Sequence, residues 1–548
     1  MGIKAFLSQT TIAKYGRALR ATPREMLFNP HLILTAMMYA MCGVPQTWDQ
    51  GTAATVPSLP GFQTHFGLDS NADQVSTFVS IIYIGYAVGA AASFLLNNRI
   101  GRLWSYRVYV AIYIIGQLIA VFANNLAALY AARVITGIGI GSVTVIGPIA
   151  LVEISPAEIR GILTSWYPVA VSGTLMVAPF CVYGIMLHIP ASRLQYQIAW
   201  FAPCIYMALC ILASFFLAES PRWLLLVNRR AEAIETFVRL RGLPADHPRI
   251  QAEIREVEEE ILIAQAEDHL TVLDMFKEMV TKTSNLRRLQ QVLVSYALAQ
   301  LSGANSITSY FVPIMGIVGL ASGEPEDKVF LSGMYGFSKL IFTLIASFFF
   351  IDALGRRKSL LIGVMTQMLS HIYIGVYIKK NQEGPVSNAA SQTAIAALFI
   401  HAFGYAVGLL ILPYVFGSEL WPHRIRSLGT VLGSTFHWLF VYAMKYGVPP
   451  LLSSTNNWGA FIFFAGWCGV AWVYVFTLVP EVAGLSVLEI EELFRGRWGG
   501  AWRGGERVLE GREGGGKDLH EDGDGEGDAG GEEEVDRERE RRGKKDSV

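Results

Sequence analysis

Charged residues are scarce in this chain. Asp, Glu, Lys and Arg make up 16% of its 548 residues, whereas 52% are hydrophobic. Ordinary soluble domains carry about 25% charged residues, so the composition excludes an ordinary soluble protein of this length and favours one embedded in a membrane. The net charge is −1, and a balance this close to neutral predicts no nucleic-acid partner.

Cysteines are also few, and the motifs of several chemistries are missing. The five cysteines are odd in number and lie inside apolar stretches, which argues against a disulfide framework. The sequence has no metal-spaced His/Cys cluster, phosphate-cradling loop or nucleophile–base constellation, so we expect no metal, no cofactor and no enzyme. The N-terminus, MGIKAFLSQT, lacks an apolar core before a small-residue cleavage site, so we expect the first spanning helix to act as the insertion signal.

Long apolar runs are what the chain does contain. A helix that spans a bilayer needs about 20 mostly apolar residues. The sequence contains twelve such segments and therefore predicts an all-α integral membrane protein. The predicted helices cover residues 31–51, 75–96, 107–124, 126–151, 162–187, 197–217, 290–316, 329–351, 359–378, 391–417, 429–450 and 458–479.

Lys and Arg cluster in the N-terminal segment and in alternate connections between these helices. From Asp49 to Val75 there is neither residue. Because positive charge near helix ends stays in the cytoplasm, we expect both termini to be cytoplasmic, and we expect the protein in the plasma membrane. The sequence has no Asn-x-Ser/Thr sequon, so glycosylation gives no independent test of this topology.

The same pattern divides the chain into five regions. Ile250, Ile254, Val257 and Ile261 recur at helical spacing in the long polar connection. They predict an amphipathic helix, packed under the bundle or docking a partner. The expected regions are a cytoplasmic segment (1–30), a six-helix half (31–217), a cytoplasmic linker (218–289), a second six-helix half (290–494) and a charged, disordered tail (495–548).

The two predicted halves repeat one another. A Gly-Arg pair follows the second and the eighth helix, a Glu precedes an Arg by seven residues after the fourth and the tenth, and a Glu follows the sixth and the twelfth. Parallel six-helix repeats are a transporter architecture with the substrate site between the halves. The repeated residues are Asn98, Gly101 and Arg102 with Asp352, Gly355 and Arg356; Glu153 and Arg160 with Glu419 and Arg426; and Glu219 with Glu481.

Several motifs also resemble a known family. AESPRWLL at 218–225 is similar to the PESPRWL signature of the sugar porters of the major facilitator superfamily. The resemblance covers roughly residues 30–494 and is closest to fungal-type members. It implies the major facilitator fold and alternating access. Further matching segments are residues 132–161, 299–311, 352–363, 417–429 and 479–494.

For the cytoplasmic side, the resemblance implies a gate of ion pairs that form when the inside is shut. The expected pairs join Glu153 to Arg102 or Arg160. One exposed pair contributes about 0–1 kcal/mol, whereas a switch from 1:99 to 99:1 needs about 5.5 kcal/mol, so we expect a network. The second-half pairs join Glu419 to Arg356 or Arg426, and Glu219, Asp352 and Glu481 complete the expected gate.

Asp49, an acid at the end of the first predicted helix, is the candidate for proton coupling. At about 1.5 Å per residue, Asp49 and Arg133 fall at one depth in the outer part of the membrane, where a lone charge tends to pair. The resemblance assigns the matching acid and arginine to proton coupling. The alternative is that Asp49 is simply the first solvated residue after the helix.

The cargo site matches the family only in part. Three expected sugar-binding residues have their counterparts, but the resemblance places other residues where the family has hydroxyl partners or rings. We therefore expect a polyol, a cyclic polyhydroxy acid such as quinate, a disaccharide or another small polar cargo rather than glucose. The matching residues are Gln300, Asn305 and Tyr310, and the departures are Ala299, Ser309, Pro168, Tyr414 and His437, the last of which is alternatively a packing residue.

Together these features predict a monomeric membrane carrier of sugars or related polyhydroxylated solutes, with protons as its coupling ion. Two alternatives stay open. One is an uncoupled facilitator of the same solutes. The other is a nutrient receptor that binds cargo and signals through the tail at 495–548.

Overall fold

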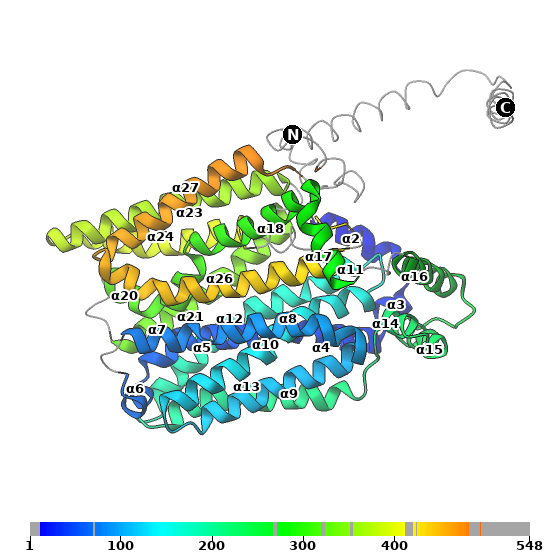
Figure 1. Ribbon diagram of the computed structural model, residues 1–548. Coiled ribbons are helices and arrows are strands. Elements are labelled where there is room, and N and C mark those ends of the chain that lie inside the picture. Colours follow the sequence, from blue (N-terminus) through cyan, green and yellow to red (C-terminus); the bar gives the residue numbers. More distant parts are fainter. Residues whose placement is uncertain are drawn as a thin grey trace, which may run out of the picture.

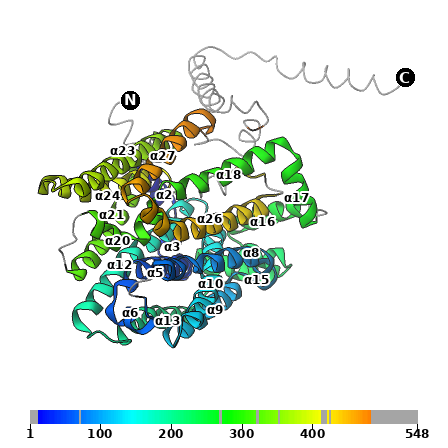
Figure 2. The same cartoon turned by 60° about the vertical axis from the view of Figure 1, so that its left-hand side comes forward.

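The computed structural model describes residues 11–68, 72–266, 271–318, 324–350, 354–410, 420–422, 425–481 and 494. Within these ranges every regular element is a helix. The long helices run side by side as one bundle, with α8, α9, α10 and α13 on one side and α18, α23, α24 and α27 on the other (Figures 1 and 2). This arrangement agrees with the predicted all-α class.

The N-terminal half is built from the first spanning segments. A short amphipathic helix and a connecting turn, α2 (Thr11–Ala21) and α3 (Arg24–Leu27), precede it. Its elements are α4 (Pro30–Ala40), η1 (Met41–Gly43), α5 (Val44–Thr55), η2 (Val56–Ser58), α6 (Pro60–Phe66), α7 (Ala72–Ser80), α8 (Ile82–Ile100), α9 (Arg102–Val121), α10 (Leu126–Ile154), α11 (Arg160–Thr164), α12 (Trp166–His188) and α13 (Leu194–Ser214).

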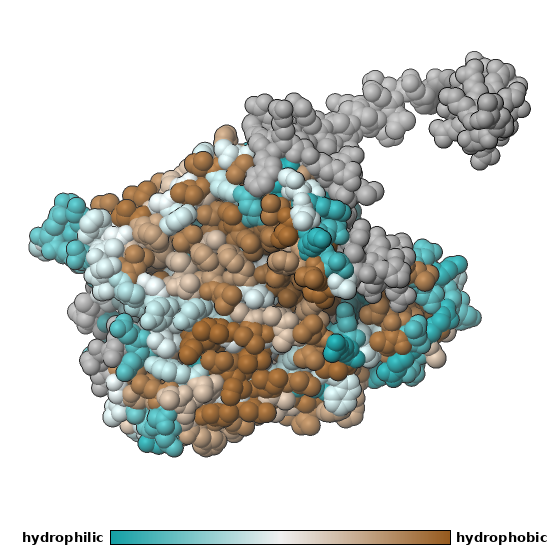
Figure 3. Space-filling model, viewed as in Figure 1, coloured by the Kyte–Doolittle hydropathy of each residue, from teal (hydrophilic) through white to brown (hydrophobic). Residues whose placement is uncertain are grey.

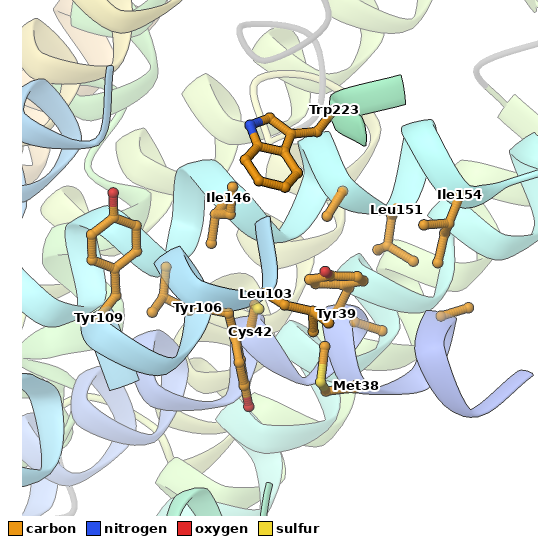
Figure 4. Close-up of a cluster of buried hydrophobic side chains, with 14 of the residues drawn as sticks. Met38, Tyr39, Cys42, Leu103, Tyr106, Tyr109, Ile146, Leu151, Ile154 and Trp223 are labelled. Carbon is orange, nitrogen blue, oxygen red and sulfur yellow. The ribbon is translucent and has the colours of Figure 1, made fainter. Parts of the chain in front are cut away.

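Four helices form the linker. They are α14 (Pro221–Leu226), α15 (Arg230–Arg241), α16 (Pro248–Ala266) and α17 (Val272–Thr281). Ile250 and Ile254 are fully buried in the same hydrophobic cluster as the N-terminal half, so the apolar face of α16 packs onto the protein. Trp223 of α14 lies against that cluster near Leu103 (Figure 4), and its Nε1 donates to the carbonyl of Asn98 at 2.9 Å.

The C-terminal half repeats the sequence of long helices. Part of its tenth predicted span, residues 411–417, lies outside the described residues. Its elements are α18 (Thr283–Leu301), α19 (Ala304–Ser309), α20 (Phe311–Val318), α21 (Pro325–Ile345), the π-helical η3 (Ala346–Phe350), α23 (Arg356–Glu383), α24 (Asn388–Val407), α26 (Arg426–Ser454) and α27 (Trp458–Leu478).

Helix packing follows the same pattern in both halves. In the first half α10 packs on α8 and α9, and α9 packs on α13; in the second, α24 packs on α21 and α23, and α23 packs on α27. The halves meet where α12 packs on α21 and where α26 packs on α7 and α8. The expected repeat is therefore visible as a repeated packing arrangement.

Nine helices in the described part of the chain are long and apolar enough to cross a membrane. The three predicted spans that do not reach this standard are the first, the seventh and the eleventh. The first is divided into α4, η1 and α5, the seventh into α18, α19 and α20, and the eleventh, α26, is continuous but more polar. Apolar residues nevertheless cover a broad band of the surface between two polar ends, as a lipid-embedded protein requires (Figure 3).

The break in the seventh span has a local cause. Gly303 has a φ of +78°, and a Cβ there would lie 2.9 Å from the ring of Phe464. The carbonyl of Ser302, freed from the helix at this point, accepts from Nε2 of His371 at 2.8 Å and of His401 at 3.3 Å. Because these partners satisfy the freed backbone group, the break is tolerated inside the bundle.

The two ends of the bundle differ. We call the end that carries α14–α16 the linker end and the opposite end, near α6 and α20, the far end (Figure 1). One hydrophobic cluster at the far end includes Phe62 of the first half and Phe311 of the second, and Ser76 donates to the carbonyl of Tyr446 at 2.9 Å. Toward the linker end the buried side chains form separate clusters, each mainly from one half. The far end is therefore closed in this structure.

Candidate functional site: buried charges between the two halves

Asp49 and Arg133 form a buried ion pair. Asp49 lies on α5 and Arg133 on α10, and their side chains are 0% and 3% exposed. Nη1 of Arg133 donates to Oδ1 of Asp49, and Nη2 donates to Oδ2 at 3.3 Å. Nε of Arg133 donates to the carbonyl of Phe78 at 3.3 Å, and its guanidinium lies 4.6 Å from the Phe78 ring. The alternative of a solvated Asp49 is therefore wrong.

Close packing of α10 positions Arg133. A Cβ on Gly137 would lie 2.2 Å from the carbonyl oxygen of Ile82, and one on Gly141 would lie 2.1 Å from that of Tyr86. Only glycine allows α10 and α8 to approach this closely. The glycines of this helix thus bring Arg133 to a fixed place beside Asp49.

Two further cations lie inside the bundle. Lys339 of α21 is 6% exposed, and Lys445 of α26 is 2% exposed. Nζ of Lys339 donates to Oγ1 of Thr308 at 3.0 Å and lies 5.4 Å from the ring of Tyr405. Nζ of Lys445 donates to the hydroxyl of Tyr83 at 2.5 Å. The sequence motifs do not single out either lysine, although a single lysine within an apolar helix is a signal for a buried functional cation.

An aromatic cluster with rings from both halves includes Tyr83, whose ring centroid lies 4.3 Å from Nζ of Lys445. Tyr83 and Tyr86 of α8 pack against Trp438 of α26, with ring centroids 6.0 and 4.8 Å away. His437 lies 4.6 Å from Trp438 and 4.7 Å from Tyr296 of α18. His437 is thus a buried member of an aromatic wall.

The residues expected to bind cargo on the seventh span are brought together only in part. Nδ2 of Asn305 donates to Oε1 of Gln300 at 2.9 Å. Nε2 of Gln300 and Oγ of Ser309 are buried and find no hydrogen-bond partner in the described part of the chain. Tyr310 instead donates its hydroxyl to the carbonyl of Lys445 at 2.8 Å, so its polar group holds the backbone of α26. Tyr414 lies outside the described residues.

Pro168 has a different setting. It is exposed and lines a small cavity between α12 and α21, with Ser172, Leu340 and Thr343, beside Tyr15 of α2. The hydroxyl of Tyr15 donates to the carbonyl of Gly161 at 2.8 Å. Pro168 therefore belongs to the linker-end part of the interface between the halves.

The expected gate residues include two matching helix caps. Oε1 of Glu219 accepts the backbone N–H of Arg102 at 2.9 Å, and Oε1 of Glu481 accepts that of Arg356 at 3.1 Å. Each carboxylate thereby caps the first turn of a long helix, α9 or α23. Burial raises the pKa of Glu219 above its usual value, while the N–H groups of Ser220, Leu103 and Arg102 oppose that rise.

Each cap requires the glycine before it. Gly101 has φ +89° and ψ 174°, and Gly355 has φ +83° and ψ 163°, a region that is essentially restricted to glycine. A Cβ on Gly101 would lie 2.6 Å from Oε2 of Glu219, and one on Gly355 would lie 2.7 Å from Oε2 of Glu481. The Gly-Arg repeat seen in the sequence is thus a repeated backbone geometry.

The first-half gate pair is Arg102 with Glu153. Nε and Nη2 of Arg102 donate to the two oxygens of Glu153 at 2.7 and 2.6 Å, and Nη1 donates to Oδ1 of Asn98 at 3.2 Å. The two charged side chains are only 7% and 8% exposed, so the energy expected for an exposed pair does not apply. Arg160 is exposed and has no ion pair with any residue that the structure describes.

Of the second-half gate, part lies outside the described residues. Asp352 and Glu419 are not described, so their expected pairs stay predictions. Nη2 of Arg426 donates to the carbonyl of Trp421 at 3.5 Å. The backbone N–H of Arg357, the residue after Arg356, also donates to Glu481 at 3.0 Å.

Two repeated six-helix halves in an apolar belt, with buried charges where they meet, define a membrane solute carrier of the major facilitator type. The family described as "Sugar (and other) transporter" matches residues 35–494. The chain belongs to this family, which confirms the resemblance seen in the motifs and makes the protein a transporter rather than an enzyme.

Relatives and solved structures agree with this assignment. The chain is 29% identical to the quinate permease of Emericella nidulans over 87% of this chain and 90% of that protein. It is 28% identical to a probable quinate permease of Aspergillus flavus over 87% and 90%.

Among solved structures, one of the proton:xylose symporter XylE bound to 6-bromo-6-deoxy-D-glucose has a TM-score of 0.68 at 19% identity, covering 85% of this chain and 100% of that chain. A partially occluded inward-open structure of XylE from E. coli has a TM-score of 0.69 at 18% identity, covering 83% and 99%. These similarities confirm the major facilitator fold.

Proposed function

We propose that this protein carries small polyhydroxylated solutes across a membrane by alternating access and couples their movement to protons. The observation that carries the proposal is the buried ion pair of Asp49 and Arg133. A carboxylate this deep in a bundle is costly unless it is paired or protonated. Exchange between those two states is a chemical means of taking up and releasing a proton.

The closed far end indicates which stage of the proposed transport cycle this structure represents. Protonation of Asp49 would release Arg133 and allow the halves to close around cargo. Loss of the proton on the linker side would restore the pair. A far end that is closed while Asp49 and Arg133 are paired fits the stage after proton release.

The gate would act at the linker end. In the proposed cycle the pair of Arg102 and Glu153, together with the caps at Glu219 and Glu481, stabilises one arrangement of each half. The corresponding pairs of Glu419 with Arg356 or Arg426, and the part of Asp352, remain proposals. Removal of one pair should bias the equilibrium rather than abolish transport, because several groups share the switch.

The cargo is proposed from the chain's polar residues and from its relatives. Gln300, Asn305 and Ser309 offer groups that can hydrogen-bond hydroxyls, while His437 and the undescribed Tyr414 would contribute rings. Quinate permeases are named for a cyclic polyhydroxy acid. The proposed cargo class is therefore a small polyhydroxylated solute, bound between the halves by residues of the seventh, tenth and eleventh spans.

The orientation is part of the proposal. Lys and Arg at the linker end favour a cytoplasmic linker and cytoplasmic termini. On this basis residues 31–217 and 290–494 form the two moving halves, 218–289 the cytoplasmic linker, and 1–30 and 495–548 cytoplasmic ends. We propose a monomer in the plasma membrane.

Transport by purified protein in liposomes tests the proposal. Labelled sugars, polyols and quinate are offered under an inward proton gradient, with and without a protonophore. We expect accumulation above equilibrium that the protonophore abolishes. Equilibration unaffected by the protonophore would favour the uncoupled facilitator instead. Binding without flux, combined with a growth phenotype on deleting residues 495–548, would favour the receptor.

A further inference from the structure

Lys339 and Lys445 are cations that form no ion pair with any carboxylate that the structure describes. Both are more than nine-tenths buried, and each Nζ donates to a neutral hydroxyl, of Thr308 or Tyr83. Among the described residues, Asp49 is the only acid that is buried to the same degree. Asp49 is already engaged by two hydrogen bonds from Arg133. Neither lysine therefore has a counter-ion of its own.

A buried cation in this condition is unfavourable. Removing an ammonium group from water is costly, and a neutral hydroxyl recovers only part of the lost hydration. Arg133, Lys339 and Lys445 are buried within α10, α21 and α26, and Asp49 of α5 is the one buried carboxylate among the described residues. The interior between the halves thus has an excess of positive charge.

Two buried donors lie on the seventh span, which also supplies Thr308, the partner of Lys339. Nε2 of Gln300 and Oγ of Ser309 are buried and have no hydrogen-bond partner among the residues that the structure describes. The Tyr335 ring lies 5.8 Å from Nζ of Lys339, and Ser309 follows Thr308. Unsatisfied buried donors beside unbalanced cations are what a site for an oxygen-rich anion would leave when that anion is absent.

We infer that the cargo carries a carboxylate, and that Lys339 and Lys445 bind it while the neighbouring amide and hydroxyl groups bind its hydroxyls. This inference rests on the proposed function and narrows its cargo to polyhydroxy carboxylates. It agrees with relatives named quinate permeases. It also assigns two cargo-binding residues, one on α21 and one on α26.

A purely structural role for the lysines is the competing explanation. The bond from Lys445 to Tyr83 joins α26 to α8, and so joins the two halves. A tether of that kind would affect every cargo equally. A carboxylate ligand would instead affect acids more than neutral molecules of the same skeleton, and this difference separates the two explanations.

The test measures binding of quinate and of its neutral carboxamide to purified protein in detergent, through tryptophan fluorescence with isothermal calorimetry as a second readout. We expect the wild type to prefer the acid. Lys339→Met and Lys445→Met should each reduce the acid-to-amide preference about tenfold or more, because a charge-assisted hydrogen bond is lost. Lys445→Arg should keep most of the preference, and Lys277→Met, an exposed lysine on α17, should leave it unchanged.

The outcomes separate this inference from the proposed function. A wild type that binds acid and amide equally, or lysine variants that weaken both alike, would overturn the inference, even if neutral solutes are transported. A lysine-dependent preference for the acid supports it. Such a preference in a protein that moves no cargo in liposomes would remove the transport proposal while retaining the carboxylate site.

Discussion

Replacing Asp49 with Asn tests the proton role directly. Asn has the size of the protonated acid and cannot ionise, so the variant holds the site permanently in the state that resembles a bound proton. The proposed cycle then lacks the step in which Asp49 releases its proton and recaptures Arg133. Cargo should still cross between the two sides in exchange, but it should no longer accumulate.

The structure sets the size of the effect. Arg133 is 2% exposed, and besides Asp49 its partners are the carbonyl and the ring of Phe78. Breaking a buried ion pair costs about 3–5 kcal/mol. Because the Asn carbonyl still accepts a hydrogen bond, we take about 3 kcal/mol, which is roughly a hundredfold shift away from the arrangement in which residue 49 holds Arg133. Exchange should therefore slow but remain measurable.

The assay uses proteoliposomes with an imposed proton gradient. One pH unit is worth about 1.4 kcal/mol per proton, or about tenfold accumulation for one proton per cargo. We expect this accumulation in the wild type and an inside-to-outside ratio of about one in Asp49→Asn, with exchange retained. Asp73→Asn, which neutralises an exposed acid on α7, is the matched control and should accumulate like the wild type. Accumulation by Asp49→Asn at the wild-type level would refute the proton role.

Three further predictions concern the linker end. Gly101→Ala should lower the apparent melting temperature by several degrees, because it adds about 1–3 kcal/mol of backbone strain and a clash with Glu219. The control is Gly67→Ala, which has φ +65° but open space around it and should cost only about 1–2 kcal/mol. Equal losses of stability in the two variants would contradict the capping geometry. The raised pKa of Glu219 means that its ionisation costs the folded state more than the unfolded state, so the wild type should lose stability relative to Glu219→Gln as pH rises through that pKa; a constant difference in melting temperature across pH would count against this. Trp223→Phe should cost about 1–3 kcal/mol, because the Asn98 carbonyl loses its donor, and unchanged thermal unfolding would show that this contact is unimportant.

Much of the fold could be predicted from the sequence because apolar length is a direct physical requirement of the bilayer. Segments such as 126–151 and 458–479 correspond to single helices, α10 and α27. The repeat of the two halves can also be predicted from the sequence. Gly101 and Gly355 need similar backbone angles, and Glu219 and Glu481 cap the same position of their helices. These residues are constrained locally, so their spacing survives in the sequence.

The ion pair of Asp49 and Arg133 was predictable for a related reason. Helix rise places both residues at one depth, and a buried charge requires a partner. The depth of Asp49 in the membrane does not by itself predict that its side chain is buried. Asp49 is enclosed because α5 packs on α12, where a Cβ on Gly51 would lie 2.8 Å from Cβ of Ala178. Such enclosure depends on residues far away in the chain.

The cargo residues were less predictable because side-chain direction depends on how the broken helices turn. Tyr310 was expected to face cargo, yet its hydroxyl reaches the backbone of α26. Pro168 was expected near the cargo, yet it lines the cavity beside Tyr15. In both cases the motif gave the position along the helix but not the direction in which the residue points.

The spans that are least suited to lipid indicate where the chemistry lies. Among the described helices, the first and seventh spans are broken and the eleventh is too polar to meet the apolar standard. These same spans carry Asp49, Gln300 and Lys445, all of them buried. Such polar and charged groups are unfavourable on a helix that faces lipid, because each costs free energy in hydrocarbon. A helix that faces the interface between two halves can accept them, provided that a proton or a charged cargo compensates them during the cycle. The departure of these spans from apolarity is thus an independent physical argument for the proposal that cargo and proton meet near α5, α19 and α26. Of these, α19 packs on α5 across the interface and on α26 within its own half.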